Sequence, residues 1–225
     1  MWQYVTYLGL AALAASLVII LMPGGQAWFR WIFGPVPPLV AVGAGAVVGL
    51  VALFFLMRRA GFSVFLGRRT LRGLAVSAGF STAFGVAIVI ADLLLRYPED
   101  TNVPVPQALL FYPAVGFVAE VIFHLVPLAI VLGVLTPLSQ RLGPERSIRS
   151  AIAVTVLAES VFQVVFAKEF LSWTTAWTAL HVSAISLAQL HVFRRYDFVT
   201  MYGFRMIYYG YWHILWGVIR LEVMF

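Results

Sequence analysis

Long apolar runs, separated by short clusters of charged residues, proline and glycine, make up most of the chain. Dividing the chain at those clusters leaves apolar segments near residues 4–22, 38–57, 71–95, 108–135, 149–167, 174–193 and 200–221. Each segment is close to the roughly 20 residues that an α-helix needs to cross the hydrocarbon core of a bilayer. The pattern therefore predicts an all-α fold, a polytopic membrane bundle of about seven transmembrane helices, rather than a barrel of strands.

The composition of the chain supports the same prediction. Hydrophobic residues make up 62% of the 225 residues, charged residues make up 11%, and the mean hydropathy is +0.95. A water-soluble core cannot bury that much apolar surface, and no segment is polar enough for a soluble domain, so we expect a single transmembrane domain over residues 1–225. The first segment lacks a basic start and a small-residue cleavage site, which favours a retained helix over a signal peptide. The absence of cysteine excludes disulfides, thiolate metal ligands and a cysteine nucleophile.

Positive charge is distributed unevenly among the connections between the predicted spans. We assign eleven arginines to one side of the membrane: Arg58, Arg59, Arg68, Arg69, Arg72, Arg141, Arg146, Arg149, Arg194, Arg195 and Arg205. The other side has only Arg30, Arg96, Lys168 and Arg220. The positive-inside rule then places the N-terminus in the cytoplasm and the C-terminus outside, in what we expect to be a prokaryotic inner or plasma membrane. Because topology explains the basic residues, no nucleic acid partner is expected.

Several titratable side chains fall near the middle of predicted spans, where each costs about 2.5–3.5 kcal/mol on insertion scales. Glu120 and His124 lie in the fourth span, Glu159 in the fifth and His213 in the seventh. Glu120 and His124 are four residues apart and share a helix face. Because these residues lie at a similar depth on different helices, we expect them to converge in one polar site within the lipid.

Other polar residues of the spans receive structural interpretations. We expect His181, in the sixth span, to be hydrogen-bonded to a carbonyl group and His191 to lie at the cytoplasmic interface. Asp92 is predicted to pair with Arg96, one turn later. The long connection 96–107 is interpreted as a linker, with a cover over an active site as the alternative.

The chemistry expected of the site follows from its residue types. A carboxylate beside an imidazole can help to deprotonate water, which is hydrolase chemistry. The same side chains could instead hold Zn, Mn or iron, so a divalent metal is an open alternative as a cofactor. The spacing Glu-x-x-x-His is a looser signature than the His-Glu-x-x-His of zinc proteases, so metal binding stays undecided.

Three segments, 119–124, 155–159 and 213–217, carry these residues on separate spans. In that order they resemble the motifs Glu-Glu-x-x-x-Arg, Phe-x-x-x-His and His-x-x-x-Asn of the CPBP family of intramembrane CAAX-type endopeptidases and bacteriocin-immunity proteins. The resemblance covers about residues 108–221, and Glu120 and His213 match outright. The departures are Ala119 for the first glutamate, His124 for the arginine, Thr155 for the phenylalanine, Glu159 for the histidine and Gly217 for the asparagine.

The resemblance implies an intramembrane hydrolase, CAAX-type endopeptidase-like, acting on a membrane peptide or protein. In such a site Glu159 or Glu120 would act as the general base, His124 would orient it, and His213 would support the developing oxyanion. One alternative is a noncatalytic family relative that binds a peptide, a lipid or a partner protein. Another is a heme- or pigment-binding accessory subunit of a membrane complex, with histidine ligands among the aromatic residues around His213.

Overall fold

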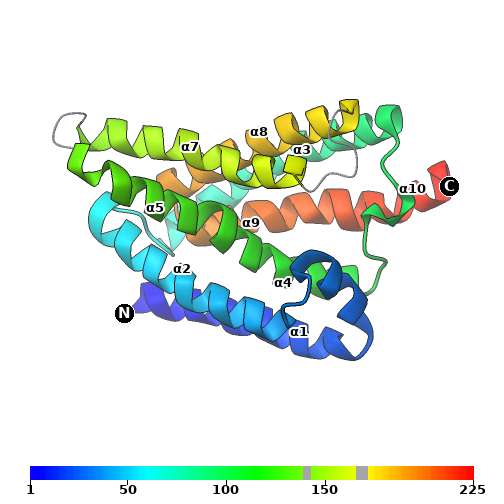
Figure 1. The fold of residues 1–225 in the computed structure, drawn as a ribbon, viewed down its shortest axis with the longest axis horizontal. Coiled ribbons are helices and arrows are strands. Elements are labelled where there is room, and N and C mark those ends of the chain that lie inside the picture. Colours follow the sequence, from blue (N-terminus) through cyan, green and yellow to red (C-terminus); the bar gives the residue numbers. More distant parts are fainter. Residues whose placement is uncertain (139–142, 166–171) are drawn as a thin grey trace.

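The computed structural model describes residues 1–138, 143–165 and 172–225; Arg141, Lys168 and the end of the predicted fifth span fall outside these ranges. The described chain consists of helices and contains no strand. Seven helical passes run along the long axis, and the two termini lie at opposite ends (Figure 1). The passes are α1 (Trp2–Phe33), α2 (Pro38–Ala60), α3 (Arg68–Leu95), α4–η2–α5 (Ala108–Glu120, Val121–Leu125, Val126–Leu135), α7 (Pro144–Val165), α8 (Trp173–Arg195) and α9–η4–α10 (Phe198–Tyr209, Gly210–Leu215, Trp216–Met224). Two short 3₁₀ helices, η1 (Glu99–Thr101) and η3 (Thr136–Leu138), lie between passes.

Five of the passes are long and apolar enough to cross a membrane: Trp2–Phe33, Pro38–Ala60, Arg68–Leu95, Ala108–Leu135 and Pro144–Val165. The described chain is therefore an all-α bundle that fits an integral membrane protein, with five candidate spans where the sequence predicts seven. The two other passes carry more polar side chains within them, His181 and Gln189 in α8 and Arg205 and Arg220 in α9–η4–α10. All four of these side chains are buried. Their polarity therefore faces the interior of the bundle.

Helix α1 extends well beyond its predicted end. The sequence pattern ends the first span at residue 22, but the helix continues through Pro23 to Phe33, and Gly34 ends it with a φ of 59°. Phe29 is buried against Phe111 of α4, with ring centroids 5.2 Å apart. Tertiary packing thus maintains a helix that proline would weaken in isolation.

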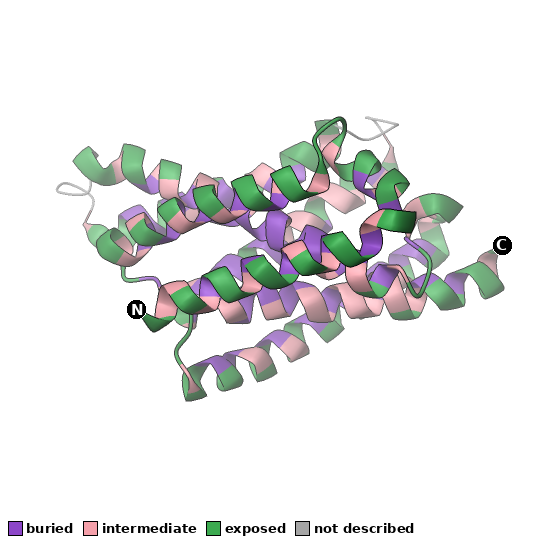
Figure 2. Cartoon of the chain, turned by 90° about the horizontal axis from the view of Figure 1, so that it is seen from below, coloured by how far each residue is buried: buried purple, intermediate pink, exposed green. Residues whose placement is uncertain are grey.

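Apolar side chains cover the outside of the bundle. Figure 2 shows exposed residues along the outer helix faces and buried residues where the helices meet. Leu94 and Val134, for example, are 77% and 68% exposed. Soluble monomers rarely expose contiguous apolar surface on this scale, so these faces suit contact with lipid.

Glycines allow α1 and α2 to approach each other closely. The Tyr7 hydroxyl of α1 donates to the carbonyl oxygen of Gly45 in α2 at 3.1 Å. A Cβ atom added at Gly49 would lie 2.0 Å from the same hydroxyl. Small residues four apart on one helix therefore permit a backbone contact that larger side chains would block.

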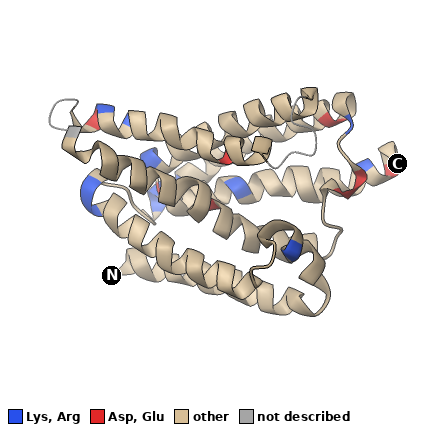
Figure 3. Cartoon of the chain, viewed as in Figure 1, with Lys and Arg blue, Asp and Glu red and all other residues tan. Residues whose placement is uncertain are grey.

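We call the end of the bundle where the N-terminus lies the N-terminal end. Asp197 connects two segments of the chain there by hydrogen bonds. Its carboxylate caps α9 by accepting from the backbone N–H of Thr200 at 2.8 Å, and it also accepts from the backbone N–H of Leu66 at 3.0 Å. The cap begins α9 at Phe198 and so places Arg205 two turns inside the helix. Arginine residues gather at this end (Figure 3), and the opposite end is called the C-terminal end.

Candidate functional site

A buried arginine lies where the four helical passes that contain α4, α7, α8 and α9 meet. Arg205 of α9 is 4% exposed, and its Nε donates to Oε1 of Glu120 in α4 at 2.5 Å. Its Nη1 and Nη2 donate to the two carboxylate oxygens of Glu159 in α7, both at 2.9 Å. Gln189 of α8 also donates to Glu120. One guanidinium thus joins two carboxylates from different helices, with the fork geometry that distinguishes arginine from lysine.

The position of Arg205 corrects the sequence interpretation. We predicted Arg205 in a connection, among eleven arginines on the cytoplasmic side, but it is the buried counter-ion of Glu120 and Glu159. The cause is the Asp197 cap, which starts the helix seven residues before Arg205. The sequence did hold a signal for this, because an aspartate directly before an apolar run marks a helix start.

His124, in the π-helical segment η2, completes the Arg205 cluster, which consists of Glu120, His124, Glu159, Gln189 and Arg205. The Nδ1 of His124 lies 2.8 Å from Glu120 Oε2, although the ring is turned so that an N–H there would not point straight at the oxygen. Both side chains are fully buried. The other ring nitrogen, Nε2, makes no hydrogen bond to any residue that the structure describes. The pair is similar to a carboxylate–imidazole dyad, in which the carboxylate orients the ring and the second nitrogen moves a proton.

Three of the four oxygens of the two carboxylates accept hydrogen bonds. Glu159 accepts both terminal nitrogens of Arg205 and, at 3.3 Å, the hydroxyl of Ser186 in α8. Glu120 accepts Arg205 and Gln189 on Oε1 and faces His124 with Oε2. Among the described residues, Glu120 Oε2 and both ring nitrogens of His124 therefore make no hydrogen bond, although Oε2 and Nδ1 lie 2.8 Å apart.

His213 makes no hydrogen bond to the Arg205 cluster and contacts it through Tyr209, so its share in one site with the other three residues stays a prediction. Its Nδ1 lies 2.7 Å from Oδ1 of Asn102, and its ring stacks on Tyr112 of α4 with centroids 4.2 Å apart. Tyr209 stands between His213 and Arg205: its hydroxyl accepts from Arg205 Nη1 at 3.0 Å, and its ring meets His213 edge-on at 4.9 Å. Eight residues of helix correspond to about 12 Å, so His213 lies nearer the C-terminal end.

Both candidate histidines lie in π-helical segments. His124 is in η2 (Val121–Leu125) and His213 is in η4 (Gly210–Leu215). A π segment widens one turn of a helix and changes the direction in which the following side chains point, and such segments occur frequently at functional sites. The two widened turns favour a functional role for these histidines beyond helix packing.

A second buried arginine, Arg220 of α10, ties the connection 96–107 to the bundle. Its Nε donates to Asp92 Oδ2 at 2.8 Å, its Nη2 to the carbonyl oxygen of Tyr97 at 2.6 Å, and Trp216 Nε1 donates to the same Asp92 oxygen at 2.7 Å. The predicted pair of Asp92 with Arg96 is wrong, because Arg96 adopts a φ of 53° that ends α3 and leaves its side chain exposed. We call Asp92, Tyr97, Trp216 and Arg220 the Arg220 clamp. Burial raises the pKa of the Tyr97 phenol within it.

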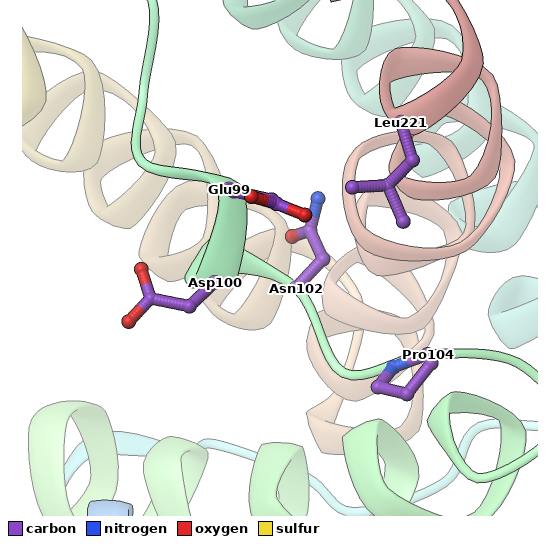
Figure 4. Close-up of a pocket in the computed structure, with 5 residues that line it drawn as sticks. All are labelled: Glu99, Asp100, Asn102, Pro104 and Leu221. Carbon is purple, nitrogen blue, oxygen red and sulfur yellow. The ribbon is translucent and has the colours of Figure 1, made fainter. Parts of the chain in front are cut away.

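A pocket of about 400 Å³ opens beside the clamp at the C-terminal end (Figure 4). Its lining consists of Glu99, Asp100, Asn102, Pro104 and Leu221. Figure 4 shows the Glu99 side chain directed toward Asn102 and the Asp100 side chain directed away from it. The connection 96–107 therefore forms one wall of a pocket and supplies Asn102 as the partner of His213. The sequence of this connection did not predict that contact.

The two remaining histidines have structural surroundings. His181 was expected to bond to a carbonyl group, but its Nε2 lies 3.1 Å from the hydroxyl of Tyr208, and its ring packs on Trp177 with centroids 5.7 Å apart. His191 is exposed near the end of α8. A buried hydroxyl satisfies His181 as well as a carbonyl oxygen would.

The donor set of the Arg205 cluster does not fit a divalent metal. No group of three histidine, aspartate or glutamate side chains able to hold a metal ion occurs in the described residues. Arg205 occupies the position between the carboxylates where a cation would bind.

No protein-family model matches the chain, and neither a curated protein nor a solved structure matches it. The functional interpretation of the Arg205 cluster therefore depends on its own geometry.

Proposed function

We propose that the chain is a seven-span membrane protein, with its N-terminus in the cytoplasm and its C-terminus outside, that works as an intramembrane hydrolase. Seven spans are supported by the course of α8 and α9–η4–α10, which run beside the five apolar passes along the same axis (Figure 1). The polar side chains that reduce the hydropathy of these two passes are buried, so their outer faces suit lipid. The orientation is supported by the arginines gathered at the N-terminal end (Figure 3).

The Glu120–His124 pair carries the hydrolase proposal. Glu120, itself held by Arg205 and Gln189, lies 2.8 Å from Nδ1 of His124, so Nε2 is the nitrogen left to act as the general base. In the reaction, Nε2 takes a proton from water while the water oxygen adds to the carbonyl carbon of a peptide bond. The proton then passes to the amine nitrogen as the carbon–nitrogen bond breaks. The substrate class that the family resemblance implies, a membrane peptide or protein of CAAX type, agrees with a site at this depth.

The charges of the cluster favour His124 over the glutamates as the base. Two carboxylates and one guanidinium leave one net negative charge buried among the helices. A proton that arrives on His124 cancels that charge, which lowers the electrostatic cost of burial during the proton transfer. Glu120 and Glu159 thus become positioning residues, a change from the roles that the family motifs imply for them. Since His213 lies about two turns away, the oxyanion needs another donor.

A noncatalytic relative that binds a peptide, a lipid or a partner protein is the second candidate. It is favoured by the hydrogen bonds of Arg205 to both carboxylates and by the burial of these carboxylates, since Glu120 is 0% and Glu159 is 6% exposed. In that case the Arg205 cluster would only hold the passes together.

Cleavage by the purified protein in lipid vesicles separates the two candidates. A farnesylated peptide ending in a CAAX sequence and a single-span membrane peptide are offered as substrates, and mass spectrometry identifies the products. We expect His124→Ala to lower the cleavage rate by about 10²- to 10⁴-fold, the usual contribution of a general base. His191→Ala removes an exposed histidine and serves as the matched control, with no expected change. Unchanged cleavage by folded His124→Ala would overturn the assignment of the base, and no cleavage by the wild type would favour the binding protein.

A further inference from the structure

One face of the last helical pass connects the Arg205 cluster with the pocket at the C-terminal end. The residues of this face, which we call the Tyr209 face, follow one another at intervals of four: Arg205, Tyr209, His213, Gly217 and Leu221. In an α-helix, residues four apart drift by about 40° per step, so four steps would carry the last residue to the other side. The π segment η4 lies within this stretch, and its wider turn offsets part of the drift.

The contacts along the Tyr209 face show that it stays directed toward α4 and the connection 96–107. Tyr209 and His213 both pack on Tyr112 of α4, with ring centroids 5.4 and 4.2 Å apart. Gly217 lies against Asn102, and Leu221 lines the pocket together with Asn102. A continuous row of contacts therefore leads from the pocket to Arg205.

Polarity and exposure both change along this row. Tyr209 and His213 are half-buried, whereas Arg205, Glu120 and His124 are buried. Between Asn102 and Arg205 the row offers polar groups, because His213 binds Asn102 and the Tyr209 hydroxyl accepts from Arg205. Such a row differs from the apolar outer faces of the same pass, where Leu215 is 57% exposed.

Asn102 closes the row at its pocket end. Its Oδ1 holds His213 at 2.7 Å, and its Nδ2 would lie 3.1 Å from a Cβ atom at Gly217. That Nδ2 is buried and has no hydrogen-bond partner among the residues that the structure describes. A single side-chain hydrogen bond thus keeps the amide in place, and an unsatisfied buried donor favours its displacement.

We propose that the Tyr209 face is the route by which water reaches the Arg205 cluster from the pocket at the C-terminal end, and that Asn102 is its gate. The proposal rests on the proposed function, because a hydrolase needs water at His124. It explains why the partner of His213 comes from the connection 96–107, and why the one glycine of α10 lies beneath Asn102.

Cysteine labelling tests the route, because the natural chain has no cysteine. Single variants Tyr209→Cys and His213→Cys are reconstituted in vesicles and treated with a membrane-impermeant, positively charged methanethiosulfonate reagent from each side separately. Leu215→Cys, on the exposed outer face of η4, is the matched control, and Glu99→Cys in the pocket marks the C-terminal face. Only a thiol in contact with water ionises readily, so we expect Tyr209→Cys and His213→Cys to react about tenfold faster than Leu215→Cys, from the Glu99 side only.

The gate has its own test in the double variant Asn102→Ala, Tyr209→Cys, which is expected to react faster than Tyr209→Cys alone. Equal labelling of Tyr209→Cys and Leu215→Cys, or labelling of Tyr209→Cys from the opposite side only, would overturn the route. An unchanged rate in the double variant would overturn the gate. Gel filtration and thermal unfolding check that each variant folds, and His213→Cys replaces Tyr209→Cys if the latter does not. Labelling does not require cleavage of a substrate. The labelling experiment can therefore contradict the route while cleavage is observed, and it can support the route while no cleavage is observed.

Discussion

Two buried arginines on the same helical pass form clusters that differ in charge balance. Arg220 faces one carboxylate, Asp92, and directs its other nitrogens to backbone oxygens of the connection 96–107. Arg205 faces two carboxylates, Glu120 and Glu159, with His124 beside them. The first cluster is neutral and fully hydrogen-bonded, as expected of a structural clamp. The second carries an unbalanced charge that a proton on an imidazole would cancel, as expected of a site that exchanges protons.

The comparison also concerns what each cluster holds together. The Arg220 clamp joins α3 to α10 at the edge of the bundle, close to the pocket. The Arg205 cluster joins α4, α7, α8 and α9 in the centre, and its arginine faces two carboxylates where Arg220 faces one. Loss of a charge should therefore cost more in the centre than at the edge.

The largest effect is expected from Arg205→Ala, which leaves two buried carboxylates without their counter-ion. We expect it to lower the free energy of unfolding by at least about 3–5 kcal/mol, the cost of breaking one buried ion pair. Arg205→Lys keeps the charge and loses the fork, so a smaller loss is expected. Chemical unfolding in detergent micelles measures both. A change below about 1 kcal/mol for Arg205→Ala would contradict the ion bridge, since surface pairs contribute no more than that.

An intermediate effect is expected from Arg220→Leu, at about 3 kcal/mol, because Asp92 then stays buried alone. The double variant Asp92→Leu, Arg220→Leu should recover most of this stability, since a neutral pair exchanged for apolar side chains is often tolerated. The equivalent double variant Glu159→Leu, Arg205→Leu should not recover, because Glu120 keeps its charge. A double-mutant cycle at each site measures the difference. Equal recovery of the free energy of unfolding at both sites would contradict the difference in charge balance between the Arg220 clamp and the Arg205 cluster.

The smallest effect is expected from Gly217→Ala. The new Cβ atom would lie 3.1 Å from Asn102 Nδ2, so the amide must move, at a cost of about 1 kcal/mol in the free energy of unfolding. Gly210→Ala, on the same pass and with open space around it, is the control and should cost nothing. Thermal unfolding of the two variants measures the comparison. Equal stability of both would show that Asn102 is not packed against Gly217.

The sequence by itself determined the helical passes and the positions of the central residues along them. Apolar segments of membrane-spanning length and their polar interruptions are local properties, so all seven predicted segments form helices within the residues that the structure describes. The same reasoning places Glu120, His124 and Glu159 near mid-span, and the structure brings these three together. The spacing of four residues between Glu120 and His124 was enough to predict their contact, because it depends on one helix alone.

The partners of the charged residues were decided only by the tertiary structure. His213 and Asn102 are 111 residues apart, and Arg220 and Asp92 are 128 residues apart. Such pairs depend on how each helix is rotated and which helix lies beside it, and hydropathy along one segment contains neither quantity. Arg205 shows the same limit, because its assignment to a connection changed to a buried counter-ion once the Asp197 cap and the neighbouring helices were in place. The sequence shows which charged residues lie within apolar segments. The function of such a residue depends on the groups that the fold places beside it.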